Sequence, residues 1–130
     1  MSRIFRLLLC LSCFTTLLFA ANPPIKITIA TLIGSAPVYL RVRVTVEPDD
    51  RNRWVCLYAQ QVRGGQESVT SCWEVHGKVE AKTTWREIKR LGGGKWDITA
   101  AVIRNDERSI LSNRYTVTVL GHGYYEPEVD

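Results

Sequence analysis

The chain has 130 residues and a formal net charge of +4, from 17 Lys and Arg against 13 Asp and Glu. This length is too short for two domains of ordinary size. The basic residues form no dense run of the kind that binds nucleic acids, so we expect no nucleic-acid partner.

The first 21 residues have the three parts of an export signal. Arg3 and Arg6 make a basic start, residues 7–19 form an apolar run, and small residues follow at 20–21. We therefore predict a cleavable signal peptide at 1–21, no stable membrane span after cleavage, and a periplasmic or extracellular location. A retained membrane anchor is the alternative interpretation.

Cys13 raises a second alternative, which is lipid modification. The residues before it resemble the end of a bacterial lipobox, but position 10 is a cysteine rather than a branched aliphatic residue. The apolar residues 14–19 also stand where a lipoprotein has a polar tether. Both cysteines of this segment fit better as small apolar members of the signal.

Residues 22–120 show the period-two alternation of half-buried β-strands, and no window shows the period of a long amphipathic helix. Turn-forming Gly, Pro, Asn and Asp stand between the alternating segments. The expected strands cover residues 25–29, 40–46, 53–60, 68–75, 83–90, 96–102 and 115–119. We predict an all-β fold, a seven-stranded antiparallel sandwich spanning 22–120.

Cys56 and Cys72 are the cysteines that remain after signal cleavage, and an exported protein meets oxidising surroundings. If they face each other across a hairpin, Val62 pairs with Gln66 and the loop is Arg63-Gly64-Gly65. A three-residue hairpin loop favours glycine at its last position, where φ is positive. We therefore predict a Cys56–Cys72 disulfide. Two buried free thiols are the alternative.

The same register divides this hairpin into two faces. The face expected to join the core carries Val55, Leu57, Ala59, Val69, Trp73 and Val75. The outer face carries the disulfide, flanked by Trp54 and Tyr58. These two aromatic residues are candidate binding residues, a platform for a glycan or a partner protein. The alternative is that Trp54 only covers the disulfide.

The last third of the chain resembles a known family. Residues 85–91 read WREIKRL, residues 92–102 read GGGKWDITAAV and residues 115–119 read YTVTV. These segments resemble the last three strands of bacterial immunoglobulin-like and fibronectin type III-like modules. In those modules a Gly-aromatic-x-aliphatic-x-Ala-x-Val strand precedes a closing x-Val-x-Val strand. The resemblance implies an immunoglobulin-like sandwich with an adhesive, spacer or binding role. Antibody-type domains join distant strands by a disulfide, whereas only fifteen residues lie between Cys56 and Cys72.

Motifs for catalysis and metal binding are weak. Cys56, Cys72, His76 and His122 lack the short paired spacing of zinc ligands, and a disulfide would occupy both sulfurs. The Gly-rich segment 92–95 lacks the Ser or Thr and the following helix of a phosphate-binding loop. We therefore predict no cofactor, no metal and no enzyme activity.

Residues 121–130 are acidic and show no alternation, so we expect a flexible tail, with a short recognition segment anchored by Tyr124 and Tyr125 as the alternative. The sequence as a whole predicts an exported, non-catalytic interaction or structural module of the cell envelope or extracellular space, with a protein or glycan partner. The alternative is a secreted inhibitor or a small-ligand- or glycan-binding protein that acts through its loops and an aromatic face.

Overall fold

The computed structural model describes residues 22–62, 68–79, 82–121 and 128–129, and these ranges contain ten strands and one short 3-10 turn. The elements are β1 (Ile25–Ile29), β2 (Ile33–Ser35), β3 (Val38–Val46), β4 (Asn52–Gln61), β5 (Ser68–Glu74), η2 (Gly77–Val79), β6 (Thr83–Leu91), β7 (Gly94–Arg104), β8 (Ser109–Leu111), β9 (Tyr115–Leu120) and β10 (Glu128–Val129). Within these ranges, no helix has the length and apolar character to cross a membrane.

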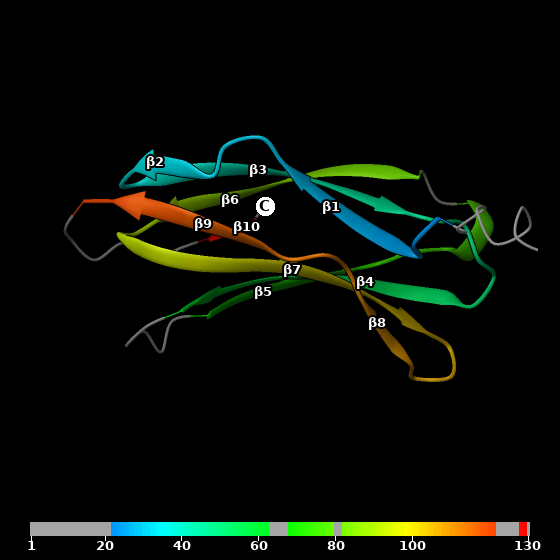
Figure 1. Ribbon diagram of the computed structural model, residues 1–130. Coiled ribbons are helices and arrows are strands. Elements are labelled where there is room, and N and C mark those ends of the chain that lie inside the picture. Colours follow the sequence, from blue (N-terminus) through cyan, green and yellow to red (C-terminus); the bar gives the residue numbers. More distant parts are fainter. Residues whose placement is uncertain (1–21, 63–67, 80–81, 122–127, 130) are drawn as a thin grey trace, which may run out of the picture.

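The strands form two sheets that pack face to face (Figure 1). One sheet has four strands in the order β1-β3-β6-β10. The other has six, in the order β2-β9-β7-β4-β5, with β8 paired to β7. All strand pairs are antiparallel except β2 with β9, which is parallel. The two layers each bury one face against the other, as a sandwich requires.

The prediction of an all-β fold is confirmed, but the prediction of seven antiparallel strands is wrong. All seven expected strands are present, and β2, β8 and β10 were not expected. Each of these has two or three residues, which is too few for an alternation to be recognised. The parallel β2–β9 pair makes the larger sheet mixed rather than antiparallel.

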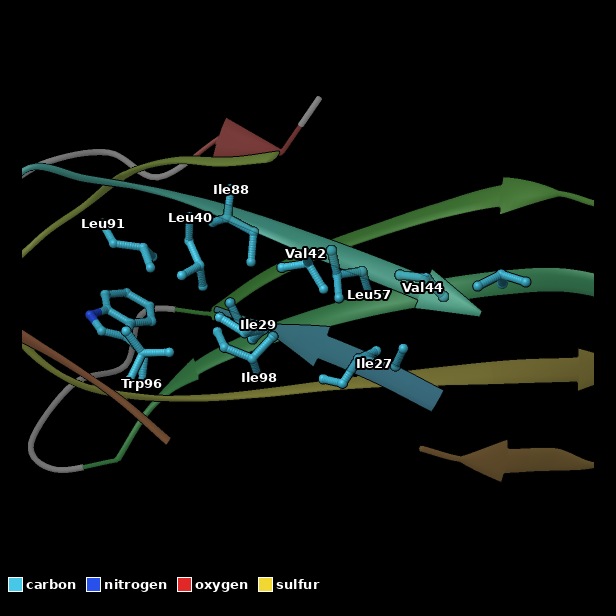
Figure 2. Packing of buried hydrophobic residues seen from close by; sticks show 14 of the residues in the cluster. Ile27, Ile29, Leu40, Val42, Val44, Leu57, Ile88, Leu91, Trp96 and Ile98 are labelled. Carbon is cyan, nitrogen blue, oxygen red and sulfur yellow. The ribbon is translucent and has the colours of Figure 1, made fainter. Parts of the chain in front are cut away.

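The core lies between the sheets and follows the alternation of the sequence. In β3, buried and more exposed residues alternate along nearly the whole strand, and β7 behaves in the same way up to Ala100. Figure 2 shows side chains from both sheets meeting in the middle, including Leu40, Val42, Leu57, Ile88 and Ile98. Trp96 is fully buried, and its indole Nε1 donates a hydrogen bond of 3.0 Å to the carbonyl of Gly92.

The β4–β5 hairpin has the register expected from its two cysteines. Trp54 pairs with Glu74, and Cys56 pairs with Cys72. Val55, Leu57, Ala59 and Val75 are buried in the core, and Val69 and Trp73 pack against it. The expected loop 63–65 lies outside the described residues. Of the expected tail, residues 128–129 pair with β6 as β10, and 122–127 also lie outside the described residues.

The turn between β6 and β7 depends on glycine. Gly94 has a φ of +131°, a value that residues other than glycine rarely adopt. A Cβ on Gly93 would collide with the carbonyl oxygen of Gly121, which lies just beyond β9. The Gly-rich segment 92–95 is therefore a tight turn that also allows close backbone contact with the end of the neighbouring strand.

A small polar network fixes the turn before β4. The side chain of Arg51 donates hydrogen bonds of 2.9 and 2.8 Å to the carboxylate of Asp49, and Arg104 lies 3.6 Å from the same carboxylate. The buried Asn52 donates to the carbonyl of Glu47 at 3.0 Å. The hydrogen bonds from Arg51 hold the pKa of Asp49 well below its usual range.

This lowered pKa predicts how the stability of the network depends on pH. Because the folded state favours the ionised carboxylate, Asp49 stabilises the protein above its ordinary pKa of about 4 and loses that contribution as the pH falls further. We expect Asp49→Asn to melt below the wild type near neutral pH, with the difference shrinking below about pH 4. Thermal melts recorded at several pH values measure this difference in melting temperature, with Asp106→Asn as the control variant. A difference that stays constant at all pH values would contradict it.

Candidate functional site

A disulfide joins Cys56 of β4 to Cys72 of β5, directly across the hairpin, where the two Cα atoms are 4.1 Å apart. The two halves differ in their surroundings, because Cys56 is only 3% exposed whereas Cys72 is exposed. The bond lies on the outer face of the six-stranded sheet, so a molecule from solution reaches it from the side of Cys72.

Cys56 lies between β5 and β7 of its own sheet. Cys56 pairs with Ala101 of β7, which is fully buried although it faces outward. Ala101 in turn pairs with Leu111 of β8, whose side chain is 65% exposed. The short strand β8 therefore extends the sheet beyond β7 and leaves an apolar side chain at the surface, on the same face as the disulfide.

The structure places the two predicted aromatic residues on either side of the disulfide along β4. Trp54 is 45% exposed and pairs with Glu74, and Tyr58 is half-buried between Thr70 and Thr99 of the adjacent strands. Both therefore lie on the expected outer face.

A hollow of about 290 Å³ opens on this face next to Tyr58. Its lining is about equally polar and apolar, with Gln60, Asp97, Thr99 and Arg114 among its polar residues and Leu111 as an apolar wall. Thr116 donates a hydrogen bond of 2.8 Å to Asp97, and Arg114 lies 3.8 Å from the same carboxylate. Sequence patterns could not reveal this hollow, because its walls come from β4, β7, β8 and the residue before β9.

The described residues do not provide a metal centre. They contain no group of three or more His, Cys, Asp or Glu side chains that could hold an ion. Of the four residues considered as zinc ligands, Cys56 and Cys72 are bonded to each other, and His122 lies outside the described residues. In the described ranges, the disulfide is therefore the group best able to change its oxidation state reversibly.

Comparison with known proteins gives matches only among solved structures; no protein-family model and no curated protein sequence matches the chain. The chain is similar to a superoxide reductase (neelaredoxin) from Ignicoccus hospitalis, with a TM-score of 0.56 and 17% identity over 73% of this chain and 80% of that one. Two single-substitution variants of that reductase also match. One has a TM-score of 0.56 and 18% identity over the same shares, and the other has 0.57 and 18%, over 75% and 82%. At this identity the likeness is one of fold.

These matches correct the family resemblance. The chain has a fold similar to superoxide reductases, and not to the immunoglobulin-like or fibronectin type III-like modules suggested by residues 92–102 and 115–119. That resemblance depended on a Gly turn followed by alternating strands, a pattern that many two-sheet proteins share.

The same structural matches also correct the predicted function. The solved structures that share the fold are enzymes by name, which contradicts the prediction of a non-catalytic module and of a chain without enzyme activity. The same finding contradicts the alternative that the main function is that of a secreted inhibitor or of a small-ligand- or glycan-binding protein. Those expectations followed from the family resemblance, from the weak catalytic and metal motifs, and from the outward-facing aromatic residues Trp54 and Tyr58.

Proposed function

We propose that this protein is an exported redox protein that exchanges electron pairs with a dithiol partner through the Cys56–Cys72 disulfide. The observation that carries the proposal is the position of the bond, on an open sheet face with Cys72 exposed and Cys56 covered. The similarity of the fold to redox enzymes supports it. The export signal expected at residues 1–21 supports an oxidising location, where such a bond persists.

The reaction is thiol–disulfide exchange. A thiolate of the partner attacks the sulfur of Cys72 and forms a mixed disulfide, while the electron pair of the broken S–S bond passes to the sulfur of Cys56. Cys56 leaves as a thiolate and takes a proton from solvent. The second thiol of the partner then attacks the partner's sulfur atom in the mixed disulfide. This step closes a disulfide within the partner and releases Cys72, which takes up a proton. The partner gains a disulfide, and this protein gains two electrons and two protons.

The architecture allows the bond to open without unfolding the protein. Strand β4 is held on its other side by β7, with which it pairs from Asn52 to Gln61. Strand β5 is at the edge of the sheet and pairs with β4 from Ser68 to Glu74. Reduction removes one crosslink and leaves this backbone ladder in place, so both thiols stay opposite each other for reoxidation.

The hollow beside Tyr58 suits the partner that this reaction needs. Its polar groups, Gln60, Asp97 and Arg114, supply hydrogen-bond donors and acceptors for an extended peptide, and Leu111 adds an apolar contact. A peptide bound there would lie on the same open face as Cys72. We expect this surface to orient a partner cysteine for attack, since positioning is a large part of the rate of a two-molecule reaction.

The difference between the two cysteines gives the direct test. With a small aromatic disulfide as thiol probe, we expect the Cys72 thiol of Cys56→Ser to react about ten times faster or more than the Cys56 thiol of Cys72→Ser. Circular dichroism checks that both variants fold. We also expect the folded wild type to oxidise a reduced two-cysteine peptide, with neither variant doing so. A bond that dithiothreitol reduces only after denaturant has unfolded the protein would contradict the proposal and leave a purely structural crosslink.

The names of the similar structures also favour an activity toward superoxide, and this second candidate needs a separate assay. The described residues do not fit a metal centre, so we derive no step that passes through one. Superoxide consumption by the purified protein, with and without a dithiol, should be compared between the wild type and Cys56→Ser/Cys72→Ser. Consumption that the double variant leaves unchanged would exclude the disulfide as its redox group.

A further inference from the structure

A second hollow, of about 410 Å³, lies on the outer face of the other sheet. It is lined by Tyr39, Arg41 and Arg43 of β3, by Trp85 of β6 and by Thr28 of β1. These strands belong to the four-stranded layer of Figure 1, so the hollow and the disulfide are on opposite sides of the sandwich. The proposed redox reaction does not use this hollow, and binding there is independent of that reaction.

The alternation of β3 explains why these side chains gather. Positions 39, 41 and 43 face outward because Leu40, Val42 and Val44 face the core. Arg43 is flanked by Thr28 on one side and Trp85 on the other, since it pairs with both. The sheet thus places two guanidinium groups around one indole ring.

The two arginines share this ring. The Cζ atom of Arg41 is 4.3 Å from the centre of the Trp85 ring, and that of Arg43 is 5.8 Å from it. Such stacking uses the flat face of a guanidinium and leaves its N–H edges free to donate. The ring therefore contacts both cations without using the N–H donors in the plane of each guanidinium.

These donors have no anionic partner within the described part of the chain. Neither Arg41 nor Arg43 takes part in an ion pair there, and the buried Nε of Arg43 has no hydrogen-bond acceptor. Glu87 pairs with Arg41 in the strand register but forms no ion pair with it. Two neighbouring positive charges repel, and a buried donor without an acceptor is unfavourable. An anion in the hollow would relieve both.

We propose that this hollow binds the oxyanion group of a small organic molecule, a carboxylate, phosphate or sulfate, through Arg41 and Arg43. Guanidinium groups bind such oxyanions with paired, charge-assisted hydrogen bonds. Tyr39 and Trp85 are 60% and 50% exposed and provide an apolar surface beside the charges. The ligand class is therefore an anion attached to an apolar or aromatic body, which binds better than the inorganic ion alone.

Titration calorimetry with four probes tests the proposal: benzoate, phenyl phosphate, phenyl sulfate and inorganic phosphate. We expect at least one aromatic anion to bind the wild type with a Kd of about 1 mM or lower, and more tightly than inorganic phosphate. The tightest probe identifies the oxyanion. Arg43→Gln should weaken this binding about ten-fold or more, because it removes the donor that lacks an acceptor.

Three further variants separate a built site from general attraction of charge. Lys95→Gln removes one positive charge from the other sheet and should leave the Kd unchanged. Trp85→Leu keeps both charges but removes their ring, and should weaken binding. Glu87→Gln removes a nearby negative charge and should strengthen it. Binding of no probe, or equal losses in Lys95→Gln and Arg43→Gln, would overturn the proposal.

Discussion

Replacement of Trp96 by alanine is expected to lower the free energy of unfolding by about 3–5 kcal/mol. Trp96 is fully buried between the sheets, where Figure 2 shows its ring beside Leu91 and Leu40. Truncation leaves a cavity that the two sheets cannot close, since each is held by its own ladder. It also removes the donor that satisfies the carbonyl of Gly92 in the β6–β7 turn.

Chemical denaturation monitored by circular dichroism measures this effect. A domain of this size has a total stability of about 5–15 kcal/mol, so the alanine variant is expected to be close to unfolding. Trp96→Phe keeps a six-membered ring and loses the hydrogen bond and only part of the buried volume, so its destabilisation should be smaller and it should stay folded. Trp85→Ala is the matched control, a tryptophan that is half exposed on the opposite outer face. Equal losses at positions 85 and 96 would be inconsistent with the proposed core.

The strands of the core could be predicted because their signal is local. Burial against a second sheet forces apolar residues onto every other position, and a strand of five or more residues repeats that pattern often enough to be seen. The register of the β4–β5 hairpin could also be predicted, because its two strands are close in sequence and the cysteines set their alignment. The position of Trp54 and Tyr58 on the outer face follows directly from that register.

The order of the strands could not be predicted in the same way. Whether β3 pairs with β6, or β7 with β9, depends on contacts between residues far apart in sequence, and alternation alone does not specify a neighbour. This is also why the family resemblance failed. The segment at 92–102 fits the inner strand of many two-sheet proteins, and what separates their families is the arrangement of strands around it.

Apart from Tyr58, the residues of the two hollows were missed for a related reason. Arg41, Arg43 and Trp85 read in sequence as solvent-facing positions of two separate strands, and only the pairing of β3 with β6 unites them. Arg114 and Leu111 belong to a short segment without alternation. Asn113 in the same segment donates to and accepts from the backbone of Ile27, and so ties this segment to β1. The Asn113 side chain thus makes the backbone hydrogen bonds that a neighbouring strand would make. No local sequence pattern predicts such a contact.

Loss of the disulfide is expected to lower the free energy of unfolding by about 3 kcal/mol in Cys56→Ser/Cys72→Ser. The bond connects residues 16 positions apart and restricts the unfolded chain, and it attaches the edge strand β5 to the central strand β4. For a domain of this size, the loss corresponds to a melting temperature roughly 10–20 °C lower.

The melting temperature of the double variant should be compared with that of the reduced wild type. Both lack the crosslink, so both should melt at similar temperatures and remain folded below them, because β5 keeps its ladder with β4. A reduced protein that stays folded can be oxidised again, as the proposed exchange reaction requires. If both single serine variants melted at the wild-type temperature, the disulfide would contribute nothing to stability. If the reduced wild type were unfolded at room temperature, the bond would be needed for folding, and a cycle between the two oxidation states would not be available to the native protein.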